Sequence, residues 1–179
     1  MRTRAEQTAL IKTDQRFWRD LAAEVGPDRY DEPAAIGEWT FGELAGHLLG
    51  WRNRTIARLE AAARGERDPL PYEPDTDAEV DAENVAIRES HAGRPAAELV
   101  DAYTESYDRL IRALDALPQS SLADGDAFAW TEGHALIDIP FTGHLHEEHV
   151  PDVRAECRWP AFMAEAGRRG LRAQIGVRL

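Results

Sequence analysis

The sequence predicts an all-α protein, a four-helix bundle with long loops and a C-terminal extension. Three observations support this fold class. Apolar residues recur at three- and four-residue spacing over most of the 179 residues, alternating β-branched runs are few, and glycine or proline ends each periodic stretch. The length suits one domain, which we place at residues 1–167, with residues 168–179 as a C-terminal tail.

The first two helices have clear starts and stops. We expect the first helix from Arg4 to Val25, because Gly26-Pro27 follows its apolar stripe directly. A linker over residues 27–38 leads to Thr40, which has Glu43 three positions on. This is the capping-box arrangement, and it predicts a second helix that ends near Gly65.

The remaining elements follow from later breaks. A proline-containing loop over 66–77 precedes a short helix over 77–91, and Pro95 starts a helix that ends before Pro118. Residues 119–133 are predicted to form a polar loop. A last long helix is predicted from about Ala135 or Pro140 to Gly167, kinked or split at Pro151.

Glycine recurs at every fourth position of the second helix, at Gly42, Gly46 and Gly50. Residues four apart lie on the same helix face, so this spacing predicts close packing against another element. It is not a glycine-rich phosphate loop, and no Gly-x-Ser-x-Gly nucleophile motif is present.

Composition excludes several classes of function. The net charge of −12 argues against nucleic-acid binding, which needs cations to displace phosphate counterions. The sequence contains no 18-residue apolar stretch of the kind that predicts a membrane span. A single cysteine, Cys157, excludes an internal disulfide framework. We expect a cytoplasmic protein whose partner is a small molecule. The oligomeric state stays open, with a homodimer among the alternatives.

Four of the six histidines lie in two places, and these carry the candidate chemistry. His47 falls on the buried face of the second helix, and the run His144-Leu145-His146-Glu147-Glu148-His149 follows about a hundred residues later. On a helix His146 and His149 can reach one site, whereas His144 points elsewhere. Metal sites in bundles project inward from facing helices, and imidazole suits transition metals. The alternatives are a hydrogen-bonded core histidine at 47 and a solvated polar face at 144–149.

Other residues give weaker signals. Trp39, Trp51 and Trp130 are candidates for lining a substrate pocket, although aromatic residues at helical spacing also form cores. His91 and His134 fall at predicted helix ends or in loops, where a surface role is expected. Cys157 lacks an obvious base partner and is a poor nucleophile candidate.

Two stretches of the chain resemble a known family. The run Trp39-Thr40, Glu43 and His47-Leu48, followed by Trp51, resembles the second-helix signature of the DinB superfamily of bundle proteins. The later stretch is similar to the last-helix motif Thr-x-x-His-Tyr-x-Glu-His of its ClbS/DfsB-like branch. The match is partial there. Thr142, Glu148 and His149 match the motif. Leu145 stands where the motif has its first histidine, and His146 stands where it has tyrosine.

The resemblance implies a divalent metal, Zn or Ni, bound by one histidine of the second helix and two of the last. His47 and His149 carry over as ligands, and His146 is the candidate third ligand beside the position that Leu145 occupies. Glu148 would orient a ligand or act as general base, with His149 as the second catalytic candidate. Relatives include thiol-dependent transferases and isomerases such as mycothiol-dependent maleylpyruvate isomerase, so a low-molecular-weight thiol is implied as cosubstrate.

The resulting hypothesis is an enzyme that acts on a small electrophilic molecule, in detoxification or self-protection. Hydrolytic ring opening, known in the ClbS-like branch, and thiol-dependent transfer or isomerisation both remain open. In a metal-free version His149 or Glu148 would activate water directly. The alternatives from other classes are a non-catalytic protein that sequesters a small molecule and a structural dimerisation module.

Overall fold

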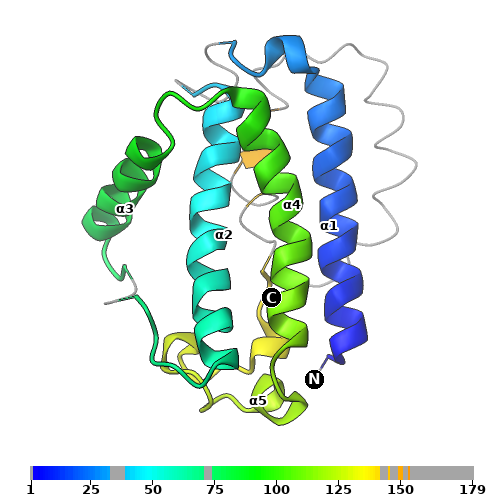
Figure 1. Cartoon of the computed structure of the whole chain (residues 1–179), viewed down its shortest axis with the longest axis vertical. Helices are drawn as coiled ribbons and strands as arrows, with labels where there is room; N and C mark the ends of the chain where they lie inside the picture. Colours follow the sequence, from blue (N-terminus) through cyan, green and yellow to red (C-terminus); the bar gives the residue numbers. More distant parts are fainter. Residues whose placement is uncertain are drawn as a thin grey trace.

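The computed structural model describes residues 2–32, 39–70, 74–141, 145, 149, 150 and 153. These residues form an all-α structure without a β-strand, as the sequence predicts. Helices α1 (Arg4–Val25), α2 (Phe41–Ala63) and α4 (Ala96–Asp115) run side by side, with α4 packed against both α1 and α2 (Figure 1). Helix α3 (Asp77–Ser90) lies outside this group, against α2. In the described part of the chain, no helix is long and apolar enough to cross a membrane.

Three helices begin with the same local device. The side chains of Thr3, Thr40 and Thr76 each accept a hydrogen bond from the backbone N–H three residues on, and a glutamate at that position bonds back to the threonine N–H. The predicted box at Thr40 is therefore confirmed, and the same pattern starts α1 and α3. Because these contacts are local, they fix each helix start without help from the rest of the fold.

The core lies between α1, α2 and α4. Trp18 of α1 is fully buried, stacks on Phe41 at a centroid distance of 5.0 Å, and meets Tyr103 of α4 edge-on at 4.7 Å. Aromatic pairs in these geometries add to the stabilisation from area burial alone. The cluster ties the start of α2 to its two neighbours, and it lies a turn and a half before His47 on the same helix.

A charged side chain is buried in this core. Arg52 of α2 is 7 % exposed, and its guanidinium lies over the rings of Tyr103 and Tyr107 at 4.3 and 3.7 Å. It donates to the Tyr103 hydroxyl at 2.8 Å and to Ser106 Oγ at 3.3 Å, while the Tyr107 hydroxyl donates to Asp14 of α1 at 2.7 Å. Burial raises the pKa of both phenols, which therefore stay neutral hydrogen-bonding groups.

The predicted glycine face of α2 is where neighbouring elements come closest. A Cβ added to Gly42 would overlap Ala96 at the start of α4, and one added to Gly50 would overlap Ile87 of α3. Gly46, between them, lies against His91 and Leu99. The close packing predicted from the four-residue spacing is confirmed, and it brings the end of α3 next to His47.

Two predictions about the second half of the chain are wrong in part. The predicted polar loop over 119–133 contains a short helix, α5 (Gln119–Ala123), anchored by buried Leu122, and a 3₁₀ turn, η2 (Ala129–Thr131). The last helix does not begin at Ala135 or Pro140. Residues 136–138 form a 3₁₀ turn, η3 (Leu136–Asp138), and Ile139 is extended because a residue before proline is disfavoured in the helical region.

Among the described residues after 141, Leu145 and His149 have π-helical backbone, and Val150 and Val153 are α-helical. The predicted kink at Pro151, the helix end at Gly167 and Cys157 lie outside the described residues. The division into a domain over 1–167 and a tail over 168–179 therefore stays a prediction.

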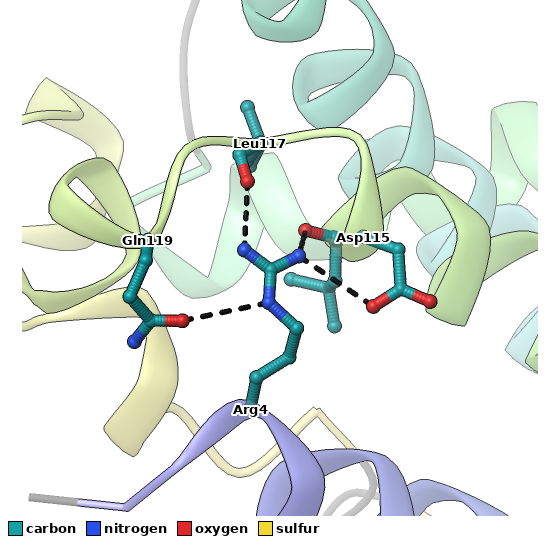
Figure 2. A network of polar contacts seen from close by, with 5 residues as sticks. Arg4, Asp115, Leu117 and Gln119 are labelled. Carbon is teal, nitrogen blue, oxygen red and sulfur yellow. Dashed lines mark hydrogen bonds and ion pairs between the residues drawn. The ribbon is translucent and has the colours of Figure 1, made fainter.

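The first helix is fastened to the end of α4 by one arginine. Arg4 donates to the backbone carbonyl oxygens of Leu114 at 2.8 Å and Leu117 at 2.7 Å, and its Nε lies 3.5 Å from Gln119 Oε1 (Figure 2). Asp115 is 3.5 Å from the same guanidinium. The last carbonyls of a helix lack intrahelical donors and carry partial negative charge, so a cation that donates to them caps the helix.

Replacing Arg4 with alanine is expected to lower the free energy of unfolding by about 1–2 kcal/mol, because two carbonyl oxygens lose a charge-assisted donor. Arg4→Lys should recover part of this loss, since lysine keeps the positive charge but lacks the planar guanidinium that donates to two carbonyl oxygens at once. The measurement is chemical denaturation followed by circular dichroism. Arg16→Ala is the matched control, because Arg16 is exposed and, within the described part of the chain, bonds to Thr13 of its own helix. Equal effects of Arg4→Ala and Arg16→Ala would contradict the capping role.

Candidate functional site

His47 and His149 meet in the structure. His47 is 6 % exposed on the second turn of α2, and its ring centroid is 5.3 Å from that of half-buried His149, with the rings nearly perpendicular. Trp39, just before α2, also packs against the His47 ring, edge-on and at a centroid distance of 5.0 Å. Two imidazoles about a hundred residues apart in the chain are thus brought together beside an indole.

The segment that carries His149 also places Leu145. Leu145 is 1 % exposed and belongs to the hydrophobic core, so the position where the resemblance expects a histidine is filled by a packed aliphatic side chain. His146 and Glu148, the candidate third ligand and candidate base, lie outside the described residues, as do His144 and Thr142. Among the residues that are described, no three histidine, cysteine, aspartate or glutamate side chains cluster as a metal site.

A pocket of about 310 Å³ opens next to His47. Its walls come from the first turns of α2, from the end of α3 and from the turn that leads into α4. The described residues that line it include Trp39, Glu43, His47, Asn84, Arg88 and His91. The volume suits a small molecule, and the pocket combines apolar surface with a few polar groups, as ligand sites do.

Polar contacts join the two helices that flank the pocket. Arg88 of α3 and Glu43 of α2 form an ion pair at 2.8 Å, in which Glu43 also accepts the Thr40 N–H of the helix cap. Asn84 of α3 accepts a hydrogen bond from the indole N–H of Trp51 at 2.9 Å. Ile87 is the only residue of α3 that is fully buried, so α3 is positioned largely by these polar links and the glycine face.

His91 belongs to this pocket, although the sequence predicts a surface role for it. It follows the last residue of α3, is half-buried, and packs its ring edge against Gly46, the residue before His47. Gly93, with a φ of +76°, lets the chain turn back so that Arg94 Nη1 lies 3.2 Å from His91 Nδ1. Burial, and secondly the charge of Arg94, lower the pKa of His91. His134, in contrast, is exposed as expected.

The three candidate tryptophans do not share one site. Trp39 lines the pocket, and Trp51 holds Asn84 of the pocket wall without lining the pocket itself. Trp130 lies elsewhere, in a second hollow with Phe128 and Arg58, whose guanidinium is 5.2 Å from the Trp130 ring centroid. The structure therefore associates Trp39 with His47, and it separates Trp130 from the histidine pair.

Arg88, His91 and Arg94 are among the residues of the pocket wall that were not identified from the sequence as site residues. Two of them are arginines on polar stretches, which ordinarily point to solvent. One signal was available, since the Gly42-Gly46-Gly50 spacing marks the α2 face where a partner approaches. The identity of that partner is a tertiary fact, because it depends on how α3 and the following turn pack on α2.

The lowered pKa of His91 predicts a titration midpoint below its usual value of about 6.5. Arg94→Gln should raise the midpoint by removing one of the two causes, and the shift should remain incomplete because burial is the larger cause. Imidazole NMR signals followed against pH report this directly. A His91 midpoint at or above about 6.5 would contradict the placement of His91.

The comparisons with known proteins agree with this architecture. The family model described as the mycothiol maleylpyruvate isomerase N-terminal domain matches residues 13–132, about two thirds of the chain. The matched range includes His47, Trp39 and His91 and ends before His149. Searches of curated proteins and of solved structures gave no match. The DinB-like resemblance is confirmed at this level, and the chain belongs to the mycothiol maleylpyruvate isomerase N-terminal domain family.

Proposed function

We propose that this protein is a thiol-dependent enzyme that uses mycothiol to transform a small electrophilic molecule, by isomerisation or by thiol transfer. The observation that carries the proposal is the His47–His149 pair, with ring centroids 5.3 Å apart beside a pocket of about 310 Å³. Membership of the mycothiol maleylpyruvate isomerase N-terminal domain family supports mycothiol as the thiol.

The histidine pair fits a divalent metal ion. Two imidazole ligands of a tetrahedral ion, each bonded at about 2.0–2.1 Å, place their ring centroids about 5 Å apart, close to the separation of His47 and His149. Imidazole nitrogens are ligands that Zn and Ni accept well. We assign His47 and His149 as the holding residues and propose His146 as the third. When bound, such an ion lowers the pKa of a thiol or water next to it.

The protein side chains supply binding and orientation. Trp39 packs on His47 and offers an apolar face to the substrate, while Asn84 and Arg88 provide polar groups on the α3 side of the pocket. The buried position of His47 limits its rotamers, so the imidazole is held in place before a ligand arrives. We propose Glu148 as the group that accepts the thiol proton or orients a ligand histidine.

A finer assignment, to the ClbS/DfsB-like branch, is a variant of this proposal. In that variant the pocket receives water in place of a thiol, and the reaction is a hydrolytic ring opening that protects the cell. Its support is the partial last-helix motif, in which Glu148 and His149 match. The two versions differ in one observable, the requirement for mycothiol.

A second function is favoured by Leu145. This leucine is buried in the core at the position where the resemblance expects a histidine. A site with two imidazoles binds a metal more weakly than one with three. A protein that sequesters a small molecule in the same pocket without turnover would need no metal. Under this reading His149→Ala leaves ligand binding intact and there is no turnover to lose.

We expect the purified protein to conjugate mycothiol to monochlorobimane or to isomerise maleylpyruvate in the presence of mycothiol. His47→Ala and His149→Ala should each lower kcat/KM by about 100-fold or more, since removal of a positioned catalytic or ligand group costs this much. The same variants should lose bound Zn or Ni, measured by elemental analysis of protein purified without chelators.

The control is His134→Ala, which removes an exposed histidine that does not line the pocket. It should retain activity and metal content. Turnover that is independent of mycothiol would transfer support to the hydrolytic variant. Absence of both turnover and metal in the wild-type protein, with a ligand still bound, would leave only the sequestering function.

A further inference from the structure

The ring of His91 has a fixed hydrogen-bonding polarity. Arg94 Nη1 lies 3.2 Å from His91 Nδ1, and a guanidinium only donates hydrogen bonds. Nδ1 must therefore be the acceptor, and the neutral imidazole carries its proton on Nε2. The lowered pKa, caused by burial and by the nearby Arg94 charge, agrees with a neutral ring at physiological pH.

The donor on the other side of this ring lacks an acceptor. Nε2 is buried, and no hydrogen-bond partner for it exists among the described residues. A buried N–H without a partner costs free energy, so nearly all such groups in proteins are paired with protein or with a bound molecule. His91 thus has an oriented N–H donor, at the end of α3, that has no acceptor among the described residues.

The placement of this donor connects it with the histidine pair. His91 and His47 line the same pocket, and the His91 ring edge that contains Cδ2, the carbon next to Nε2, packs on Gly46 beside His47. Arg88 and Arg94 also line the pocket, and Arg88 is already paired with Glu43, which leaves Arg94 and Asp31 as the other charged groups among the described lining residues. A polar group of a ligand that lies in this pocket beside His47 is then within the same lining as His91.

We propose that His91 is a substrate-binding residue whose Nε2–H donates a hydrogen bond to an oxygen acceptor, a carboxylate or a carbonyl, of the molecule bound beside His47. Because water does not reach Nε2 in the described conformation, binding must be accompanied by a small movement of the imidazole or of the end of α3. The inference rests on the proposed function, since it takes this pocket as the substrate site, and it adds the chemistry that the substrate must carry.

The test uses the full-length protein with ring-labelled histidine and two probes, sodium acetate for the carboxylate and N-methylacetamide for the neutral carbonyl, at constant ionic strength. His91→Gln identifies the His91 signals. We expect the Nε2–H tautomer in the free protein. We also expect a saturable change of the His91 Nε2 signal with at least one probe, and the probe that gives it identifies the acceptor as charged or neutral.

Variants distinguish hydrogen bonding from packing. His91→Phe keeps a flat ring without a donor and should weaken binding of the effective probe about tenfold, the factor for loss of one hydrogen bond. His91→Gln keeps an N–H donor and should recover most of the affinity. His91 occupies the residue after α3 with ordinary right-handed φ and ψ, so both side chains are compatible with the backbone, and thermal denaturation confirms folding.

An Nδ1–H tautomer would overturn the inference, as would His91 signals that neither probe moves, or equal probe affinities for His91→Phe and the wild type. The outcome is separable from that of the proposed function. A saturable probe effect at His91 in a protein without mycothiol-dependent turnover would sink the enzyme proposal and leave this binding role standing. Mycothiol-dependent turnover in a protein whose His91 signals neither probe moves would support the enzyme proposal and overturn the binding role of His91.

Discussion

The buried guanidinium of Arg52 is the interaction on which the arrangement of the three central helices depends. A charge inside a bundle is stable only when each of its partners is present, and here α4 supplies two phenol rings and a serine while α1 supplies Asp14 through Tyr107. Sliding or rotating α2 against α4 would leave the charge without these partners. Arg52 lies five residues after His47, so the constraint that sets the register of α2 also sets the height of the candidate site in the bundle.

Helix α3, which forms the pocket wall across from α2, is held mainly by polar contacts rather than by a buried network. Ile87 is the one buried residue of α3, and the Arg88–Glu43 ion pair that links α3 to α2 beside the pocket is exposed, where such a contact contributes little. The pocket therefore has one rigid side, built on the buried network, and one side with less stabilisation. This division suits a binding site, because His47 stays fixed while the α3 side can adjust to the molecule that enters.

Local signals explain what could be predicted from the sequence. Helix starts at Thr40 and stops at Gly26 and Pro118 depend on residues within a turn of the boundary, and the α2 face with His47 follows from simple periodicity. The predicted start of the last helix is wrong because of contacts outside the local pattern. Asp138 bonds with Arg2, and Pro140 follows Ile139, so residues 136–138 form a 3₁₀ turn and Ile139 is extended. The role of His91 was missed because its burial depends on Gly46 in another helix. Arg52 was missed because arginine on a helix is ordinarily a surface residue.

The burial of Leu145 has an evolutionary consequence. Leu145 and His149 are four residues apart, and both face the bundle, one toward the core and one toward His47. A histidine at position 145 would place an imidazole in the hydrophobic core, one turn before His149, and leucine codons of the form CUU or CUC become histidine codons by one base change. Under the proposed metal site, this single step would exchange aliphatic packing for a candidate ligand and would carry the desolvation cost of a buried imidazole. The chemistry of the site and the stability of the core are therefore coupled at this one position.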